Sequence, residues 1–191
     1  MRVPKMPLFL LLCAAPAVTP ATAALRDGAV ELGVFAGSYT LEEEDFGDET
    51  RSNVAGFRVG LLLTREHEIE FVYDTVEVTV AGIDIEEIES VNLRYLYNWP
   101  VGSRRAAAPY IGAGLGNVDD EVFDTPFGDV SDDDTQLSLF GGLRVFATRN
   151  FALRGEVALK SFSTFDVDQS VLEVTAGVTW ALGGRRGAGP Y

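Results

Sequence analysis

The chain has 191 residues, a formal charge of −14, one cysteine and one histidine. So acidic a chain has no net field that would attract nucleic acid, because phosphate binding needs lysine and arginine. The length suits one domain, and no stretch after the N-terminus approaches the roughly 18 consecutive apolar residues that a membrane-spanning helix requires.

The N-terminus has the pattern of a cleavable signal peptide. Arg2 and Lys5 provide a positive start, residues 7–18 are apolar, and Ala21 to Ala23 supply the small residues that signal peptidase reads. We therefore predict a signal peptide over 1–23. A retained anchor helix is the alternative, but the apolar run is too short to span a bilayer.

The only cysteine, Cys13, lies within this predicted signal peptide. Leu12 precedes it, where a lipoprotein signal would have a small residue. Processing therefore leaves a mature chain without a thiol, a disulfide or a cysteine-based metal site. We predict that the mature chain divides into a main domain over 24–182 and a Gly- and Arg-rich C-terminal tail over 183–191.

The mature chain alternates apolar and polar or small residues with a period of two, which is typical of strands with two different faces. Most of these segments approach the roughly 9–11 residues with which a tilted strand crosses a bilayer. In chain order, the eight predicted strands cover 30–37, 57–63, 68–74, 90–98, 110–117, 136–146, 151–160 and 172–182.

The connections between these segments alternate in length. Tight turns are predicted at 64–67 and 147–150, and a somewhat longer connection at 99–108. The intervening connections are longer on average and acidic, and we expect loops over 41–52, 76–87, 118–134 and 161–168. Short turns on one side and longer loops on the other are typical of an outer-membrane barrel whose N-terminus lies in the periplasm.

The two faces differ in a way that favours lipid outside and charge inside. One face is nearly free of charge and carries aromatic residues such as Tyr97, Phe151 and Trp180 near its ends, as in a lipid-facing band. The other face carries five acids and five bases among small residues, which we expect to pair within a narrow lumen. These are Glu31, Arg58, Glu68, Glu70, Arg94, Arg144, Arg154, Glu156, Lys160 and Glu173.

Strands in lipid must also close on themselves, because an open edge would leave backbone groups unpaired. The sequence therefore predicts an all-β fold, an eight-stranded antiparallel up-and-down transmembrane barrel. A soluble periplasmic ligand-binding barrel, with the charged face outward, is the competing interpretation of the same alternation.

The last predicted strand carries a resemblance to a known family. Thr175, Gly177, Trp180 and Leu182 resemble the signal by which outer-membrane proteins are recognised by the barrel assembly machinery. Together with the Gly-rich segment 109–116 and segment 151–156, this strand is similar to the eight-stranded outer-membrane β-barrel family that includes the OmpA membrane domain and the opacity-type and OmpW-like porins. Members of the family usually end on the aromatic residue of the last strand, whereas here the tail 183–191 follows.

No catalytic constellation is evident. The single histidine, His67, lies in a predicted periplasmic turn beside Glu66 and Glu68, and we interpret it as a solvated turn residue. Glu68 and Glu70 form a pair of carboxylates that could in principle act in acid catalysis, but the lumen arginines are their plausible partners. We predict no enzymatic activity and no cofactor.

Acidic runs supply the oxygen ligands that Ca²⁺ and Mg²⁺ prefer. Asp132 to Asp134 and Glu42 to Asp45 lack the spacing of an EF-hand loop, and we predict a solvated surface there rather than a specific metal site. A weaker association is an alternative hypothesis, in which these acids share divalent cations with the phosphates of lipopolysaccharide.

The sequence thus predicts a structural or surface-interaction protein of the outer membrane whose lumen is filled by side chains. Its expected partners are outer-membrane lipid, lipopolysaccharide, the barrel assembly machinery and an unidentified surface ligand. A narrow channel or small-molecule carrier, as in OmpW-like barrels, is the alternative; its support is a lumen with apolar residues near its mouth, such as Phe35, Phe140 and Phe146.

Overall fold

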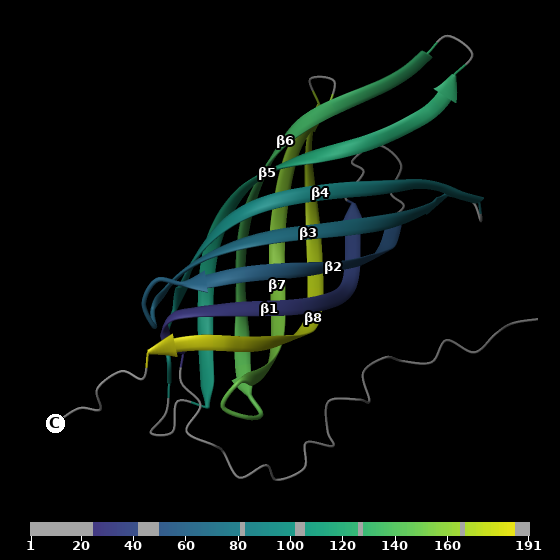
Figure 1. Ribbon diagram of the computed structural model, residues 1–191. Helices are drawn as coiled ribbons and strands as arrows, with labels where there is room; N and C mark the ends of the chain where they lie inside the picture. The colour runs from purple at the N-terminus through teal and green to yellow at the C-terminus, as the bar shows by residue number, and fades with distance from the viewer. Residues whose placement is uncertain are drawn as a thin grey trace, which may run out of the picture.

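The computed structural model describes residues 25–41, 50–80, 83–101, 106–125, 128–164 and 167–185. These residues form eight β-strands in a single sheet (Figure 1). The strands are β1 (Asp27–Leu41), β2 (Thr50–Leu62), β3 (His67–Val80), β4 (Ile83–Asn98), β5 (Ala107–Thr125), β6 (Gly128–Phe146), β7 (Phe151–Thr164) and β8 (Val167–Arg185).

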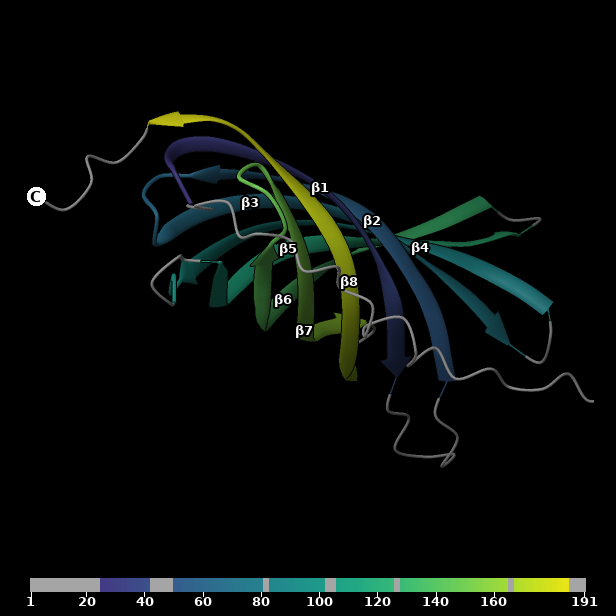
Figure 2. The same ribbon diagram turned by 90° about the horizontal axis from the view of Figure 1, so that it is seen from below.

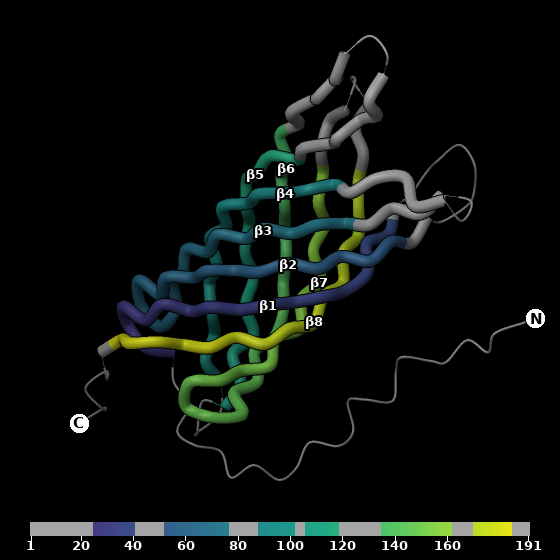
Figure 3. Tube along the Cα trace, turned by 45° about the vertical axis from the view of Figure 1, so that its right-hand side comes forward, coloured from purple at the N-terminus to yellow at the C-terminus, as the bar shows by residue number. Residues whose placement is uncertain are grey.

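The sheet is a closed barrel in which every strand pairs antiparallel with its neighbours in the chain. Closure comes from the pairing of β1 with β8, where Val34 lies opposite Val178, while on its other side Val34 lies opposite Phe57 of β2. Figure 3 shows β1 between these two partners. The predicted up-and-down barrel is therefore confirmed. Within the described residues, no helix has the length and apolar character needed to span a membrane.

The two tight turns are built alike. Thr64 and Thr148 each begin a Thr-Arg sequence, and each threonine hydroxyl accepts hydrogen bonds from backbone N–H groups two and three residues later. Such local bonds replace the ladder bonds that a reversing chain loses. Both turns lie at the end of the barrel from which β1 starts and at which β8 ends, and we call this the turn end; the opposite end is the loop end.

Strand pairing at the loop end extends further than the sequence predicted. The expected loop over 118–134 is wrong for most of its length, since β5 continues to Thr125 and β6 begins at Gly128. Likewise β3 reaches Val80 and β8 begins at Val167, both within expected loops. Backbone hydrogen bonds join these segments regardless of whether their side chains are apolar. Residues 42–49 of the predicted loop over 41–52 lie outside the described residues.

The two faces of the sheet have opposite character. Outward side chains in the middle of the strands are apolar and well exposed; Leu93, for example, is 61% exposed and Leu115 is 62% exposed. Inward side chains are buried and many of them are charged. The apolar surface that a water-soluble protein would bury is therefore on the outside, as expected for a wall that faces lipid.

Candidate functional site

The lumen holds eleven buried charged side chains among the described residues. Ten are the residues that the sequence analysis placed on one face: Glu31, Arg58, Glu68, Glu70, Arg94, Arg144, Arg154, Glu156, Lys160 and Glu173. The eleventh is Asp74, which is fully buried and was not among the ten predicted charges. Asp74 follows Glu68, Glu70 and Val72 at alternate positions of β3, so the period-two pattern places it on the same face.

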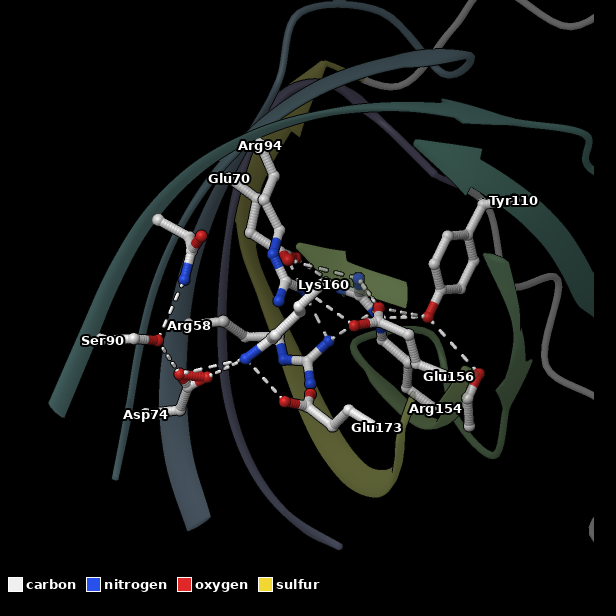
Figure 4. A network of polar contacts seen from close by, with 12 residues as sticks. Arg58, Glu70, Asp74, Ser90, Arg94, Tyr110, Arg154, Glu156, Lys160 and Glu173 are labelled. Carbon is white, nitrogen blue, oxygen red and sulfur yellow. Dashed lines mark hydrogen bonds and ion pairs between the residues drawn. The ribbon is translucent and has the colours of Figure 1, made fainter. Parts of the chain in front are cut away.

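Arg154 of β7 lies at the centre of the network shown in Figure 4. It forms an ion pair with Glu70 of β3, and its Nη2 lies 2.7 Å from Oε2 of Glu156. Its Nε donates to the hydroxyl of Tyr110, which donates in turn to Glu156 over 2.8 Å. Because β3 and β7 are four strands apart in an eight-stranded closed barrel, the Arg154–Glu70 pair joins opposite walls.

Two further arginines reach the same carboxylates. Arg94 of β4 lies 2.7 Å from Glu156, and Arg58 of β2 lies 3.4 Å from Glu156 and 4.0 Å from Glu70. Glu156 thus accepts from three arginines that come from three different strands. Such charge-assisted bonds are stronger than neutral ones, and those from Arg94 and Arg58 join β7 to β4 and β2 across the lumen.

Closer to the turn end, Arg144 of β6 connects two more acids. Its Nη1 lies 3.2 Å from Glu31 of β1, and its Nη2 donates to Glu68 of β3 over 2.7 Å. The side-chain amide of Asn98 also donates to Glu68. We call the set Glu31, Arg58, Glu68, Glu70, Arg94, Tyr110, Arg144, Arg154 and Glu156 the central cluster.

Towards the loop end lies a second, smaller set. Lys160 of β7 is 2.6 Å from Asp74 of β3 and 2.6 Å from Glu173 of β8, and the hydroxyl of Ser90 donates to Asp74. These four residues are the loop-side cluster, in which Figure 4 shows Ser90 and Asp74 at the left and Lys160 reaching from the centre towards Asp74. The carboxylates of Asp74 and Glu173 thus share one ammonium group, and both of these residues are buried.

Aromatic rings lie against the guanidinium groups. The Arg58 guanidinium lies 4.2 Å from the ring centroid of Phe35, that of Arg94 lies 4.7 Å from Phe140, and that of Arg154 lies 4.5 Å from Tyr110. Such contacts stabilise a cation that has left water. Phe35 and Phe140 therefore lie within the network rather than around an entrance.

Apolar clusters lie on both sides of the charged residues. At the loop end, Phe35, Tyr39 and Val76 pack with Val54, Val72 and Val171. At the turn end lies a cluster that we call the floor cluster, which contains the third expected mouth residue, Phe146. Its members are Leu25, Ala29, Leu62, Ala108, Phe146 and Ala152.

His67 lies away from the lumen network. It opens β3 and its Nδ1 lies 2.5 Å from the hydroxyl of Tyr95, with the ring of Tyr97 at 5.3 Å. Tyr97 in turn contacts Trp99 at 4.7 Å between ring centroids. The histidine therefore belongs to an aromatic group on the turn-end side of β3 and β4, where a membrane protein meets the interface between lipid and water.

No metal-binding group emerges from the described part of the chain, where no three histidine, cysteine or carboxylate side chains come together as ligands. The predicted acidic run Glu42 to Asp45 lies outside the described residues. Asp132 to Asp134 lie on the described backbone of β6, but their side chains do not belong to the described part.

The residues of the expected assembly signal lie on β8. Thr175 is buried on the lumen face, whereas Trp180 and Leu182 are about half exposed on the outer face. Gly177 pairs with Phe35 of β1, at the seam that closes the barrel. Recognition of this strand by the assembly machinery stays a prediction.

Comparison with known families identifies a match over almost the whole chain. Residues 8–180 match the model of the outer membrane protein beta-barrel domain. No curated protein matches the chain by sequence.

Several solved structures are similar to this barrel. The crystal structure of Neisserial surface protein A has a TM-score of 0.67 at 16% identity, covering 81% of this chain and 99% of that chain. The N-terminal β-barrel domain of Pseudomonas aeruginosa OprF has a TM-score of 0.58 at 18% identity, with 82% and 99% covered. P. aeruginosa OprG has a TM-score of 0.51 at 13% identity, with 85% and 99% covered. At these identities the likeness concerns the fold.

Proposed function

This chain belongs to the outer membrane protein β-barrel family, and on that premise we propose that it is a closed, non-enzymatic scaffold that presents its loop-end hairpins at the cell surface. Its location in the outer membrane excludes the soluble periplasmic barrel as an interpretation. In this family of folds short turns face the periplasm and the longer hairpins face outward, so we assign the turn end to the periplasm.

The observation that carries the proposal is the set of ion pairs that cross the lumen. Arg154 and Lys160 of β7 reach the opposite strand β3 through Glu70 and Asp74, and Arg144 of β6 reaches β1 and β3. All of these side chains are buried. Eight-stranded barrels have an interior just wide enough for side chains to fill, and bridges between opposite walls support a closed interior rather than an open pore.

The hairpins supply the surface for partners. Residues 118–134 alone contain eight acids, so an anionic partner such as lipopolysaccharide would be bridged to them by divalent cations. Lipopolysaccharide, which surrounds the hairpins in the outer leaflet, is therefore the partner we propose.

Reconstitution of the processed protein tests both the closed lumen and the binding of lipopolysaccharide by the hairpins. In planar bilayers we expect no steady conductance, and in calorimetric titrations we expect lipopolysaccharide to bind in the presence of Mg²⁺ and much more weakly with EDTA. A persistent open-channel current would contradict the closed scaffold. Absence of Mg²⁺-dependent binding would remove lipopolysaccharide as the partner of the hairpins.

A narrow polar path is the second candidate, and one observation favours it. On the two strands that flank β5, Asn92 of β4 and both Gln136 and Ser138 of β6 have buried polar atoms that lack a hydrogen-bond partner among the described residues. They flank Gly114 and Gly116 of β5 in the strand register. Small, selective currents in the same bilayers would support this candidate over the closed scaffold.

A further inference from the structure

The floor cluster contains one residue that does not come from a strand. Its strand residues are Ala29 of β1, Leu62 of β2, Ala108 of β5, Phe146 of β6 and Ala152 of β7. Leu25 precedes β1, yet it is 3% exposed and belongs to the same cluster. Three of the five strand residues are alanines, and Leu25 adds a larger apolar side chain to them, as expected because protein interiors pack without large voids.

A tight turn directs Leu25 into this position. The N–H of Ala29 donates to the carbonyl of Arg26 over 3.1 Å, and Gly28 has a φ of 71°. Glycine adopts this backbone conformation at no steric cost. Figure 2 shows the chain bending sharply at the purple start of β1.

Arg26 fastens the bent segment to two other parts of the barrel. Its Nη2 donates to the side chain of Asn150 over 2.9 Å, in the turn between β6 and β7, and to the carbonyl of Ala181 in β8. The end of β8 is shaped to receive it, since a Cβ on Gly184 would lie 2.7 Å from the Cβ of Arg26.

We propose that the segment Leu25 to Ala29 is a plug that seals the turn end of the lumen. The next inward position on β1 is Glu31, which pairs with Arg144, so the plug separates the central cluster from solvent at that end. If the signal peptide is removed after Ala23 as predicted, Leu25 is the second residue of the mature chain, and the mature N-terminus itself makes the seal. The plug holds whether or not the hairpins bind a surface ligand.

Thiol accessibility tests the seal directly. In a Cys13→Ser background, Ala152→Cys places a single thiol in the floor cluster of the processed protein, where a membrane-impermeant maleimide reports access from the turn end. We expect slow labelling with Leu25 present. Leu25→Asp should increase the rate by about tenfold or more, because removing a buried leucine side chain weakens packing strongly. Leu63→Asp is the matched control, since Leu63 lies at the same end of the barrel but is 49% exposed.

Further variants distinguish a lost seal from a misfolded barrel. Ala158→Cys, which lies deeper in the lumen, should stay protected in every variant, and the gel shift between unboiled and boiled samples reports an intact barrel. If Leu25→Asp abolishes that shift, Gly28→Val and Arg26→Ala disturb the turn and its anchor instead and should raise the Ala152→Cys rate. Fast labelling with Leu25 present, or unchanged labelling in intact-barrel plug variants, would overturn the proposal.

Discussion

At the scale of single residues, Lys160 offers the clearest test of the lumen network. Replacing it by methionine leaves Asp74 and Glu173 buried without their cation, and breaking a buried pair in this way costs about 3–5 kcal/mol. Urea unfolding in lipid vesicles measures the loss. Arg149→Met is the control, because Arg149 is exposed in the turn before β7 and its loss should change stability by about 0.5 kcal/mol or less.

A triple variant separates the ionic bonds from simple packing. When Asp74→Leu and Glu173→Leu are added to Lys160→Met, no unpaired charge remains, and we expect much of the lost stability to return, because apolar residues of similar size can replace a buried ionic group. A triple variant less stable than Lys160→Met alone would contradict the assignment of the cost to unpaired carboxylates.

Which residues face the lumen could be predicted from alternation, but their partners could not. The period of two assigns Glu31, Glu68 and Arg144 to one face because successive side chains of a strand point to opposite sides. That Arg144 of β6 meets Glu31 of β1 and Glu68 of β3 depends on closure and on the stagger of the strands, and these are properties of the whole sheet. The same alternation places Asp74 on the face of Glu68 and Glu70, although it was not counted among the ten predicted lumen charges.

At the scale of strands, glycines on the inner wall make room for the network. A Cβ on Gly142 of β6 would meet the carbonyl oxygen of Gly155 and the hydroxyl of Tyr110, and that hydroxyl is held by Arg154 and Glu156. Gly142→Ala should therefore destabilise the barrel by about 1–3 kcal/mol, the usual cost of overpacking. Equilibrium unfolding in vesicles is the measurement.

Gly155 of β7 gives a matched control in the neighbouring strand. A Cβ there meets no atom within 4 Å, so Gly155→Ala should be neutral or slightly stabilising, by about 0.5 kcal/mol. Equal effects of the two alanine substitutions would mean that the contact with Tyr110 does not constrain Gly142.

The number, order and direction of the strands could be predicted from the sequence, whereas their ends at the loop side could not. Charged residues were interpreted as a sign of loops, yet Asp119 pairs with Asp133 in the ladder between β5 and β6. Ladder hydrogen bonds connect backbone groups, so a hairpin continues beyond the apolar band as long as its two backbones stay in register. At the turn end, the expected tight turns were correct because polar turn residues and strand breaks coincide there.

At the scale of the whole molecule, membrane insertion explains why the usual arrangement of charge is inverted. The outer wall is apolar and exposed, while eleven charged side chains of the described residues are buried inside. In water this arrangement would leave the apolar wall without a partner, whereas in a bilayer the lipid covers it and the closed ladder leaves no backbone group unpaired. The alternation in the sequence shows that the two faces differ, and the requirement for an apolar surface towards lipid shows which face points inward.

The depth of that apolar wall in the bilayer gives the last prediction. Leu93 lies in the outward row of β4 between Tyr95 and Val91 and is 61% exposed, so an arginine there should cost about 2–4 kcal/mol, as for a charge near the bilayer midplane. Leu63→Arg, at the turn-end rim, should cost about 1 kcal/mol or less, because the headgroup region tolerates charge. Unfolding both variants in vesicles of matched thickness measures the difference. Equal costs would place Leu93 outside the hydrocarbon, and the apolar wall would then have to be covered by protein instead of lipid.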